Sequence, residues 1–349
     1  MLLRASSSME SAHPDPLGLW SPLPVLSVPT RFRRLSAPLR KSVFVAAGQF
    51  VFAAFSRMIA FVALLALLGC VSAKPLELDA PYQDGFARAR MLPMSAAAYA
   101  DNPQLCVNRI FPQGEYKRLI TKVCDPSRKD TCAAFTAASP ADKAIIVAFR
   151  GSNGVVQLFM EADETIFKNK TAFIGGGNVS EYFFGAFSLL WENGIKDDFM
   201  ALKNKYPDYE VWVTGHSLGG SMATLCAGTI LKKGWATKEK LKLVTFGQPR
   251  TGDQAFADAH DAQFSYSYRV THKRDLVPHI PFKDMEGYEH HKYEVWYNNN
   301  MASGAPFKEC KKDDSDNCSD GQLDWSIEDH LHYFGHMISE YGDGGCKDL

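Results

Sequence analysis

The sequence predicts an α/β fold with a mostly parallel central sheet and helices on both of its faces. Short runs rich in β-branched residues alternate with longer stretches in which apolar residues recur three or four positions apart. Alternation of strand, helix and strand is typical of a parallel sheet covered by helices. After Lys74 no low-complexity linker, repeat or charge block marks another boundary, so we expect one domain over residues 74–349.

Each expected element follows from its own local pattern. The run Lys143-Ala-Ile-Ile-Val-Ala-Phe149 is apolar throughout, as in strands that are buried on both sides. The strands are expected, in chain order, at residues 115–123, 131–136, 143–149, 210–214, 241–246, 266–271 and 292–297, the last of these being the final strand. Two long helices are expected at residues 181–205 and 218–233.

The composition is that of an ordinary folded protein. The chain has 349 residues, of which 46% are hydrophobic and 22% are charged, so it can bury a substantial core without metals. It contains 38 Lys and Arg residues against 39 Asp and Glu residues, a formal net charge of -1. Nucleic-acid-binding proteins usually show a concentrated basic excess, so this balance argues against nucleic acid as a partner.

The N-terminal part has the pattern of a secretory signal. An apolar run from Met58 to Cys70 follows Arg57, and small residues close it at Ala73. The run is shorter than the roughly 20 apolar residues that a membrane span needs. We therefore expect a signal peptide at 58–73, an N-terminal extension of doubtful reality at 1–57 and a secreted chain from Lys74. Two alternatives remain open, a signal anchor that includes the apolar stretch from residue 43 and an organelle transit peptide.

Seven cysteines follow the predicted signal, so one should remain unpaired. Two pairs each bracket a short polar loop and suit local disulfides in an oxidising compartment, Cys124 with Cys132 and Cys310 with Cys318. Cys106 and Cys346 would then join the two ends of the chain. Cys226 lies in an apolar helical setting and is the expected free thiol. A zinc site is disfavoured because no close pair of cysteines faces a matching pair of Cys or His.

Three N-glycosylation sequons would mark surface loops in a secreted protein. They begin at Asn169, Asn178 and Asn317.

The sharpest local motif is Gly215-His-Ser-Leu-Gly219, between an expected strand and an expected helix. A turn this tight strains its central residue, and glycines two positions to either side remove side chains that would collide. The turn exposes the Ser217 hydroxyl at a helix N-terminus, where amide groups favour developing negative charge. The alternative is a helix merely capped by serine. The strand before and the helix after favour a catalytic nucleophile.

An activated serine also needs a base, an acid that orients the base, and an oxyanion hole. Asp275 lies just past the expected strand 266–271, where the acid should be. The base should come from the cluster of histidines after Asp275 near the C-terminus, His330, His332 and His336. The oxyanion donors are expected to be the N–H of Leu218 and, after strand 143–149, Ser152 beside a glycine.

These landmarks resemble the class 3 lipases, a branch of the α/β-hydrolases typified by triacylglycerol lipases. The resemblance covers about residues 81–346 through five motifs in the same order: Val147-Ala-Phe-Arg-Gly-Ser152, Val213-Thr-Gly-His-Ser-Leu-Gly-Gly220, Thr245-Phe-Gly-Gln-Pro-Arg-Thr-Gly252, Arg274-Asp-Leu-Val-Pro-His279 and Asp329-His-Leu-His-Tyr-Phe-Gly335. It implies Ser217 as nucleophile, Asp275 as acid and Ser152 as the oxyanion hydroxyl. It selects His330 over His332, because the family's catalytic histidine precedes a Leu-x-Tyr-Phe run. A cross-link between the chain ends is also known in secreted members.

The resemblance implies a secreted serine hydrolase that cleaves lipid esters at an interface through an acyl-enzyme. It also implies transient contact with the lipid surface and no requirement for a cofactor or metal. Two alternatives stay open: an esterase for soluble esters such as feruloyl-polysaccharide, and a lipid-binding protein on an inactive hydrolase scaffold. The second is disfavoured because Ser217, Asp275 and His330 are all present. The apolar run at 155–160 is expected to be either a flap over Ser217 that opens at lipid, or a helix packed permanently on the core. It lacks a Trp that some members carry there. The oligomeric state is not predicted.

Overall fold

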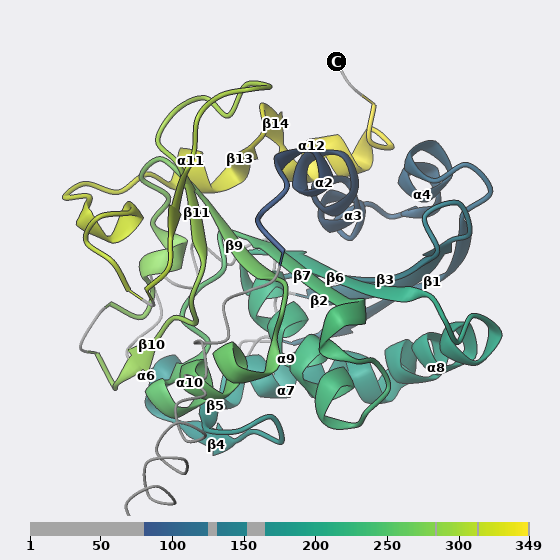
Figure 1. Cartoon of the computed structure of the whole chain (residues 1–349), viewed down its shortest axis with the longest axis horizontal. Coiled ribbons are helices and arrows are strands. Elements are labelled where there is room, and N and C mark those ends of the chain that lie inside the picture. The colour runs from purple at the N-terminus through teal and green to yellow at the C-terminus, as the bar shows by residue number, and fades with distance from the viewer. Residues whose placement is uncertain (1–79, 125–130, 152–164, 283–284, 313, 348–349) are drawn as a thin grey trace, which may run out of the picture. The chain divides into compact units, whose positions relative to one another are not determined.

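An eight-stranded sheet forms the centre of this computed structural model, which describes residues 80–124, 131–151, 165–282, 285–312 and 314–347 (Figure 1). The strands, in their order across the sheet, are β1 (Glu115–Val123), β2 (Thr131–Ser139), β3 (Ala144–Arg150), β6 (Glu210–His216), β7 (Leu241–Phe246), β9 (Ser267–His272), β11 (Glu294–Tyr297) and β12 (Lys308–Cys310). The five strands from β3 to β11 are parallel, whereas β1, β2 and β12 pair antiparallel with their neighbours. The sheet is thus mostly parallel, as the sequence predicts.

Helices cover both faces of this sheet (Figure 1). One face carries α7 (Glu181–Leu190), α8 (Lys196–Lys205), α9 (Leu218–Lys232) and α10 (Gln254–Gln263). The other face carries a set of N-terminal and C-terminal helices, α2 (Asp84–Phe86), η1 (Ala87–Met91), α3 (Leu92–Ala97), α4 (Gln104–Ile110) and α12 (Ile338–Asp343). The helices between residues 84 and 110 were not predicted, because each is at most seven residues long and shows little apolar periodicity.

Smaller elements surround the main sheet. A second sheet contains, in order, β10 (Tyr288–Glu289), β8 (Gly252–Asp253), β5 (Asn178–Ser180) and β4 (Lys170–Ala172). A third consists of β13 (His332–Tyr333) and β14 (His336–Met337). The remaining short helices are α6 (Thr165–Lys168), η2 (Trp191–Ile195), η3 (Lys238–Lys240), η4 (Val277–His279), η5 (Ser319–Gly321) and α11 (Ile327–Leu331). Within the described ranges, none of the helices has the length and apolar character required to cross a bilayer.

Two expectations about elements were wrong. The helix expected over 181–205 is interrupted at η2, where Gly194 takes φ 137°. A Cβ atom at this position would lie 2.5 Å from Cδ1 of Ile120, so the glycine permits close approach to β1. The strand β11 is not the final one, because β12 pairs antiparallel with it. The three residues of β12 are too few to give an alternating pattern.

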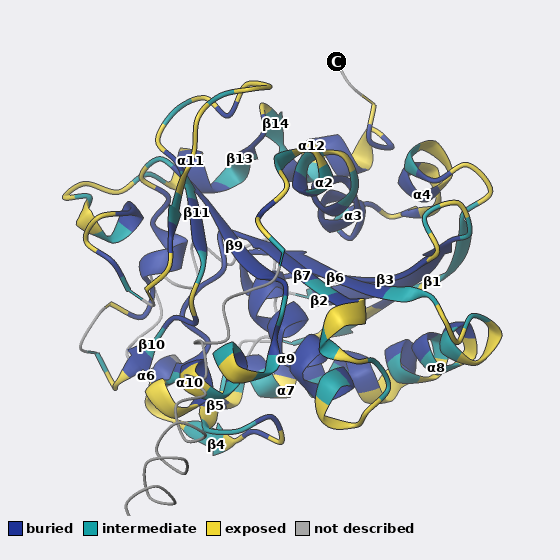
Figure 2. Ribbon diagram, viewed as in Figure 1, coloured by how far each residue is buried: buried dark blue, intermediate teal, exposed yellow. Residues whose placement is uncertain are grey.

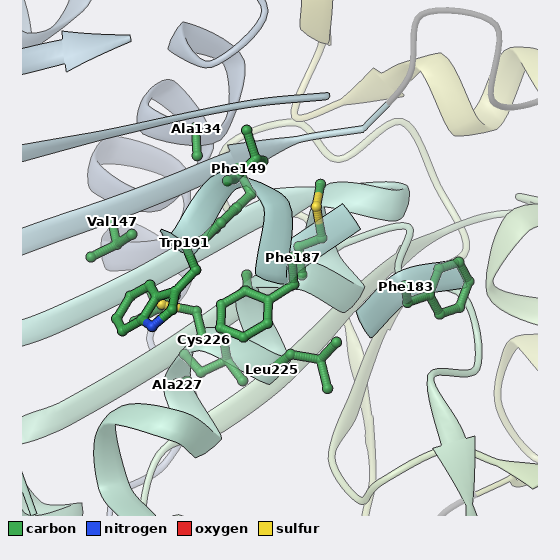
Figure 3. Packing of buried hydrophobic residues seen from close by; sticks show 14 of the residues in the cluster. Ala134, Val147, Phe149, Phe183, Phe187, Trp191, Leu225, Cys226 and Ala227 are labelled. Carbon is green, nitrogen blue, oxygen red and sulfur yellow. The ribbon is translucent and has the colours of Figure 1, made fainter. Parts of the chain in front are cut away.

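The core lies on both sides of the sheet, whose strands are mostly buried (Figure 2). Figure 3 shows how aromatic side chains fill the layer beneath α9. The ring of Phe187 lies 6.3 Å from that of Phe149 and 5.5 Å from that of Trp191. Cys226 is a free, fully buried thiol within this cluster, and burial raises its pKa. The thiol therefore packs as an apolar group.

Three disulfides join the cysteines in the expected pairs. Two close loops with a sequence separation of 8 residues, Cys124–Cys132 and Cys310–Cys318. The third, Cys106–Cys346, spans a separation of 240 residues. It joins α4 to the segment after α12, and α12 itself packs on α3. The N-terminal and C-terminal parts of the described chain are therefore fastened together on one face of the sheet.

Candidate active site

Ser217 occupies the turn between β6 and α9, with φ 61° and ψ −134°. This left-handed value of φ is strained for a residue with a side chain. Two hydrogen bonds hold the turn: the N–H of Ser217 donates to the carbonyl of Phe246 (2.9 Å), and the N–H of Gly220 donates to the carbonyl of Ser217 (2.8 Å). The serine side chain is thus fixed at the carboxyl end of a central parallel strand, where α/β sheets commonly carry their ligand sites.

The two glycines of the motif are sterically required. A Cβ atom on Gly215 would lie 2.1 Å from the carbonyl oxygen of Gly219. A Cβ atom on Gly219 would lie 2.4 Å from the carbonyl oxygen of Phe149. Both contacts are with backbone atoms, which cannot move aside without shifting β3 or α9. The glycine spacing expected for a strained turn is therefore explained by the packing of this strand and helix.

Asp275 and His330 form a buried pair. The ring Nδ1 of His330 lies 2.9 Å from Oδ1 and 3.0 Å from Oδ2 of Asp275. The carboxylate also accepts hydrogen bonds from the hydroxyl of Tyr333 (2.6 Å) and from the N–H of Val277 (2.9 Å). Burial by itself would raise the pKa of Asp275, but His330 and these two donors outweigh it and lower the pKa below its ordinary value. Asp275 is therefore a carboxylate at neutral pH.

The backbone places this pair beside Ser217. The carbonyl of Phe246 accepts from the N–H of Ser217, and the next residue is Gly247, with φ 56°. A Cβ atom on Gly247 would lie 2.8 Å from Oδ2 of Asp275 and 2.8 Å from Nδ1 of His330. His216, the residue directly before Ser217, stacks its ring on that of His330, with 4.4 Å between the centroids.

Two polar atoms at the centre of this arrangement remain unsatisfied. The hydroxyl of Ser217 and Nε2 of His330 are both buried, and neither has a hydrogen-bond partner among the residues that the structure describes. Leaving such groups unpaired costs about 1–3 kcal/mol each, so they are expected where they serve a function. A serine hydroxyl and an imidazole nitrogen are the atoms that a nucleophile and its base would present to a substrate.

His216 adds a neutral imidazole next to His330. Its Nδ1 lies 2.8 Å from the hydroxyl of Tyr99, and its Nε2 lies 2.9 Å from the carbonyl oxygen of His330. Burial, followed by the charge of His330, lowers the pKa of His216 to about 3. His216 is therefore uncharged at neutral pH, so a proton gained by His330 during reaction would not meet a second positive charge in the stacked ring.

The expected oxyanion hole is only partly within the described residues. Leu218 lies at the start of α9, and a Cβ atom on Gly151 would be 3.2 Å from the Leu218 nitrogen. The chain preceding Ser152 therefore passes next to the Leu218 N–H. Ser152 itself and the apolar run at 155–160 lie outside the described residues.

The other histidines have different surroundings. Nδ1 of His332 is 3.2 Å from a carboxylate oxygen of Glu328, and the ring of His336 stacks on Tyr341 at 4.0 Å. His330 is thus the member of the expected cluster that contacts Asp275. Within the described ranges, no group of three or more His, Cys, Asp or Glu side chains could hold a metal ion.

All three sequon asparagines are exposed. The side chain of Asn178 donates to Oδ2 of Asp253 (2.8 Å), so a glycan there would compete with a contact of the small sheet. Asn169 and Asn317 lie outside regular elements.

Several residues near the pair were not predicted as part of the site. Tyr333 and Gly247 lie within motifs that the sequence displays, but their contact with Asp275 depends on tertiary packing. Tyr99 is separated from His216 by 117 residues, and no local pattern marks it.

Comparison with known proteins gives consistent matches. The family model for class 3 lipases matches residues 146–285. A lipase of Caenorhabditis elegans is 35% identical over 301 residues, which cover 77% of this chain and 84% of that one. A secreted mono- and diacylglycerol lipase of Fusarium solani is 32% identical over 216 residues, 60% of this chain and 62% of that one. The crystal structure of a lipase from Rhizopus microsporus var. chinensis superposes with a TM-score of 0.63 at 26% identity, covering 74% of this chain and 90% of that chain.

Proposed function

This chain belongs to the class 3 lipase family of ester hydrolases, and from that membership we propose that it is a secreted lipase that cleaves acylglycerol esters through Ser217, His330 and Asp275. The observation that carries the proposal is the buried Asp275–His330 pair beside a strained serine whose hydroxyl has no described partner. The Fusarium relative, named as a mono- and diacylglycerol lipase, supports glycerides as the substrate class.

In the proposed reaction, the Ser217 oxygen attacks the ester carbonyl carbon while Nε2 of His330 takes its proton. The imidazolium that forms is stabilised by the Asp275 carboxylate at Nδ1. The tetrahedral intermediate expels the alcohol, which receives the proton from His330 and leaves an acyl-enzyme on Ser217. Water, deprotonated by His330, attacks the acyl carbon, and collapse of the second intermediate releases the fatty acid and returns the proton to Ser217.

Negative charge on the intermediate needs donors in a fixed place. The main-chain N–H of Leu218 at the start of α9 supplies one, and the helix N-terminus adds its dipole. Ser152 supplies the second donor in this proposal, supported by the approach of Gly151 to the Leu218 nitrogen. The strained turn fixes Ser217 directly before the Leu218 N–H, so nucleophile and donor are in place before substrate arrives, which reduces the reorganisation needed in the transition state.

Secretion is part of the proposal. Three disulfides suit an oxidising compartment, and the Fusarium relative is named as secreted. Residues 58–73 would be the cleaved signal and 74–349 the mature domain, with 1–57 an extension absent from the product; all of residues 1–79 lie outside the described residues. N-terminal sequencing of the protein recovered from medium should begin within a few residues of Lys74. A secreted product that retains any part of 1–57 would contradict this processing.

The catalytic assignment is tested with three variants and a soluble short-chain ester. Ser217→Ala and His330→Ala are expected to lose several powers of ten in kcat, because each removes a partner in proton transfer. His332→Ala is the matched control and should keep most activity, since His332 contacts Glu328 instead. Active His330→Ala with inactive His332→Ala would overturn the choice of base. Hydrolysis of soluble esters together with inertness toward emulsified glycerides would favour an esterase.

A further inference from the structure

Exposed apolar side chains are concentrated in the segment that leads into His330. Among the described residues, eight large hydrophobic side chains are exposed, and three of them fall within five consecutive positions. These are Leu323, Trp325 and Ile327, which are 98%, 36% and 41% exposed. Single exposed apolar residues are common on protein surfaces, whereas several close together in the chain are typical of an interaction site. We call residues 323–327 the apolar segment.

The apolar segment is fixed directly against the candidate catalytic acid. Ser326 makes a parallel β-bridge with Asp275, and its N–H donates to the carbonyl of Arg274 (2.7 Å). The hydroxyl of Ser326 caps α11 by accepting from the N–H of Asp329 (3.0 Å). Whatever binds the exposed side chains therefore lies next to the helix that carries His330.

A buried polar network supports the same segment from behind. The indole of Trp325 packs on the ring of His279, with 4.1 Å between centroids. Nδ1 of His279 lies 3.1 Å from Asp320, which also accepts from the buried guanidinium of Arg250 (2.9 Å). The apolar side chains are thus presented on an ordered backbone, which lowers the entropic cost of docking.

The charged groups beside the apolar segment are mostly paired and include no basic excess. Asp324 is paired with Arg274, and Asp329 lies 3.7 Å from the Lys273 ammonium. Glu328, 3.2 Å from Nδ1 of His332, adds a further carboxylate, so the surface carries no basic excess. An anionic membrane attracts basic surfaces, and the surface around the apolar segment is not basic. An apolar surface without a basic excess and with a partly exposed tryptophan fits an uncharged lipid phase, because indole rings favour the boundary between apolar and aqueous regions.

We propose that the apolar segment, Leu323, Trp325 and Ile327, docks this protein onto an uncharged acylglycerol surface and so holds the region beside Asp275 and the helix of His330 against the lipid. This proposal rests on the proposed lipase function for its choice of partner. It assigns docking to a surface within the described residues, independent of any movement of residues 155–160. Lipid contact would remove the exposed Leu323 and Ile327 side chains from water next to the helix that carries His330.

The test compares two double variants that each replace two exposed apolar side chains. Leu323→Ser with Ile327→Ser alters the apolar segment but spares Trp325, which packs on His279. The control is Leu105→Ser with Val123→Ser, whose side chains are 54% and 51% exposed on α4 and β1. Figure 1 shows α4 and β1 at the opposite end of the sheet from α11. Each pair is placed in a Ser217→Ala background for binding and in the active chain for hydrolysis.

Binding is measured by sedimentation with droplets of long-chain triacylglycerol, and with vesicles of phosphatidylcholine with and without phosphatidylglycerol. The apolar-segment variant should bind droplets about 10-fold more weakly or worse, while the control binds as the parent does. Both should hydrolyse a soluble short-chain ester at the parental rate. Equal droplet binding by the two variants would overturn the proposal, as would binding that requires phosphatidylglycerol.

Two further outcomes are distinguishable. If the parent is a dimer in sedimentation equilibrium and the apolar-segment variant is a monomer, the surface is an interface between two copies and the proposal is wrong. Droplet binding of the Ser217→Ala chain does not require hydrolysis. Failure of the active chain to cleave any ester would therefore overturn the proposed function, whereas normal hydrolysis with unchanged droplet binding would overturn only this inference.

Discussion

The carboxylate of Asp275 shows at the scale of one residue how a buried charge is maintained. It is 1% exposed, and burial alone would favour its protonated form. Hydrogen bonds from His330, Tyr333 and the Val277 N–H compensate for the lost water and keep the pKa low. Tyr333 is a positioning residue in this account, because it acts on the reaction only through Asp275.

Tyr333→Phe should therefore weaken both catalysis and folding. The change keeps the ring but leaves the Asp275 carboxylate short of one donor, and a hydrogen bond to a charged group contributes about 1.5–3 kcal/mol. We expect kcat on a soluble ester to fall about 10-fold or more with little change in KM. We also expect the free energy of unfolding to fall by about 1.5–3 kcal/mol. Unchanged kcat and unchanged denaturant midpoint would show that the hydroxyl has no such role.

The residues that could be predicted from sequence are those whose function depends on local backbone geometry. Ser217 was predictable because a strained turn needs glycines at fixed positions, and Asp275 because it follows a strand. Tyr99 could not be predicted, since its contact with His216 is made by tertiary packing across 117 residues. Gly247 carries a left-handed φ and touches the Asp275–His330 pair, yet its motif alone does not identify that contact.

At the scale of elements, the close packing of α9 on β6 and β3 determines the site. Most of the parallel strands are rich in apolar and β-branched residues, which is why their bounds were predicted to within two residues. The break at Gly194 was missed because apolar spacing continues through it. The edge strand β12 was missed because three residues carry too little pattern.

Gly215→Ala tests this packing. The added methyl group would overlap the Gly219 carbonyl at 2.1 Å, so we expect a loss of about 3 kcal/mol or more in the free energy of unfolding, or failure to fold. Gly185→Ala is the matched control, because Gly185 lies in α7 and an added methyl group there would meet nothing within 4 Å. It should stabilise the chain by about 0.5–1 kcal/mol. Equal stability of the two variants in chemical denaturation would contradict the packing argument.

At the scale of the whole molecule, several histidines are buried in uncharged form. Burial is the largest cause in each case, and it lowers the pKa of His216 and His260 to about 3 and the pKa values of His290 and His291 well below the ordinary value. The unfolded chain binds protons at these sites near pH 6.5, whereas the folded chain does not until much lower pH. Stability is therefore lost as pH falls from about 6.5 toward 3.

The expected loss is on the order of 1 kcal/mol per pH unit for each such histidine. Denaturant titrations at several pH values between about 7 and about 4.5 would measure this slope. His260→Gln should make this slope shallower, because it removes one of the buried histidines whose pKa is lowered in the folded chain. A stability that does not vary across this range would contradict the assignment of neutral buried histidines.

The central claim is that Ser217 is a nucleophile activated by the Asp275–His330 pair, and covalent labelling tests it most directly. A phosphonate ester of the kind that phosphonylates activated serines should modify the native protein at one site, identified as Ser217 by peptide mass spectrometry. His330→Ala should react several powers of ten more slowly, because the serine loses its base. Labelling at a different serine, or an unchanged rate of labelling in His330→Ala, would contradict the account.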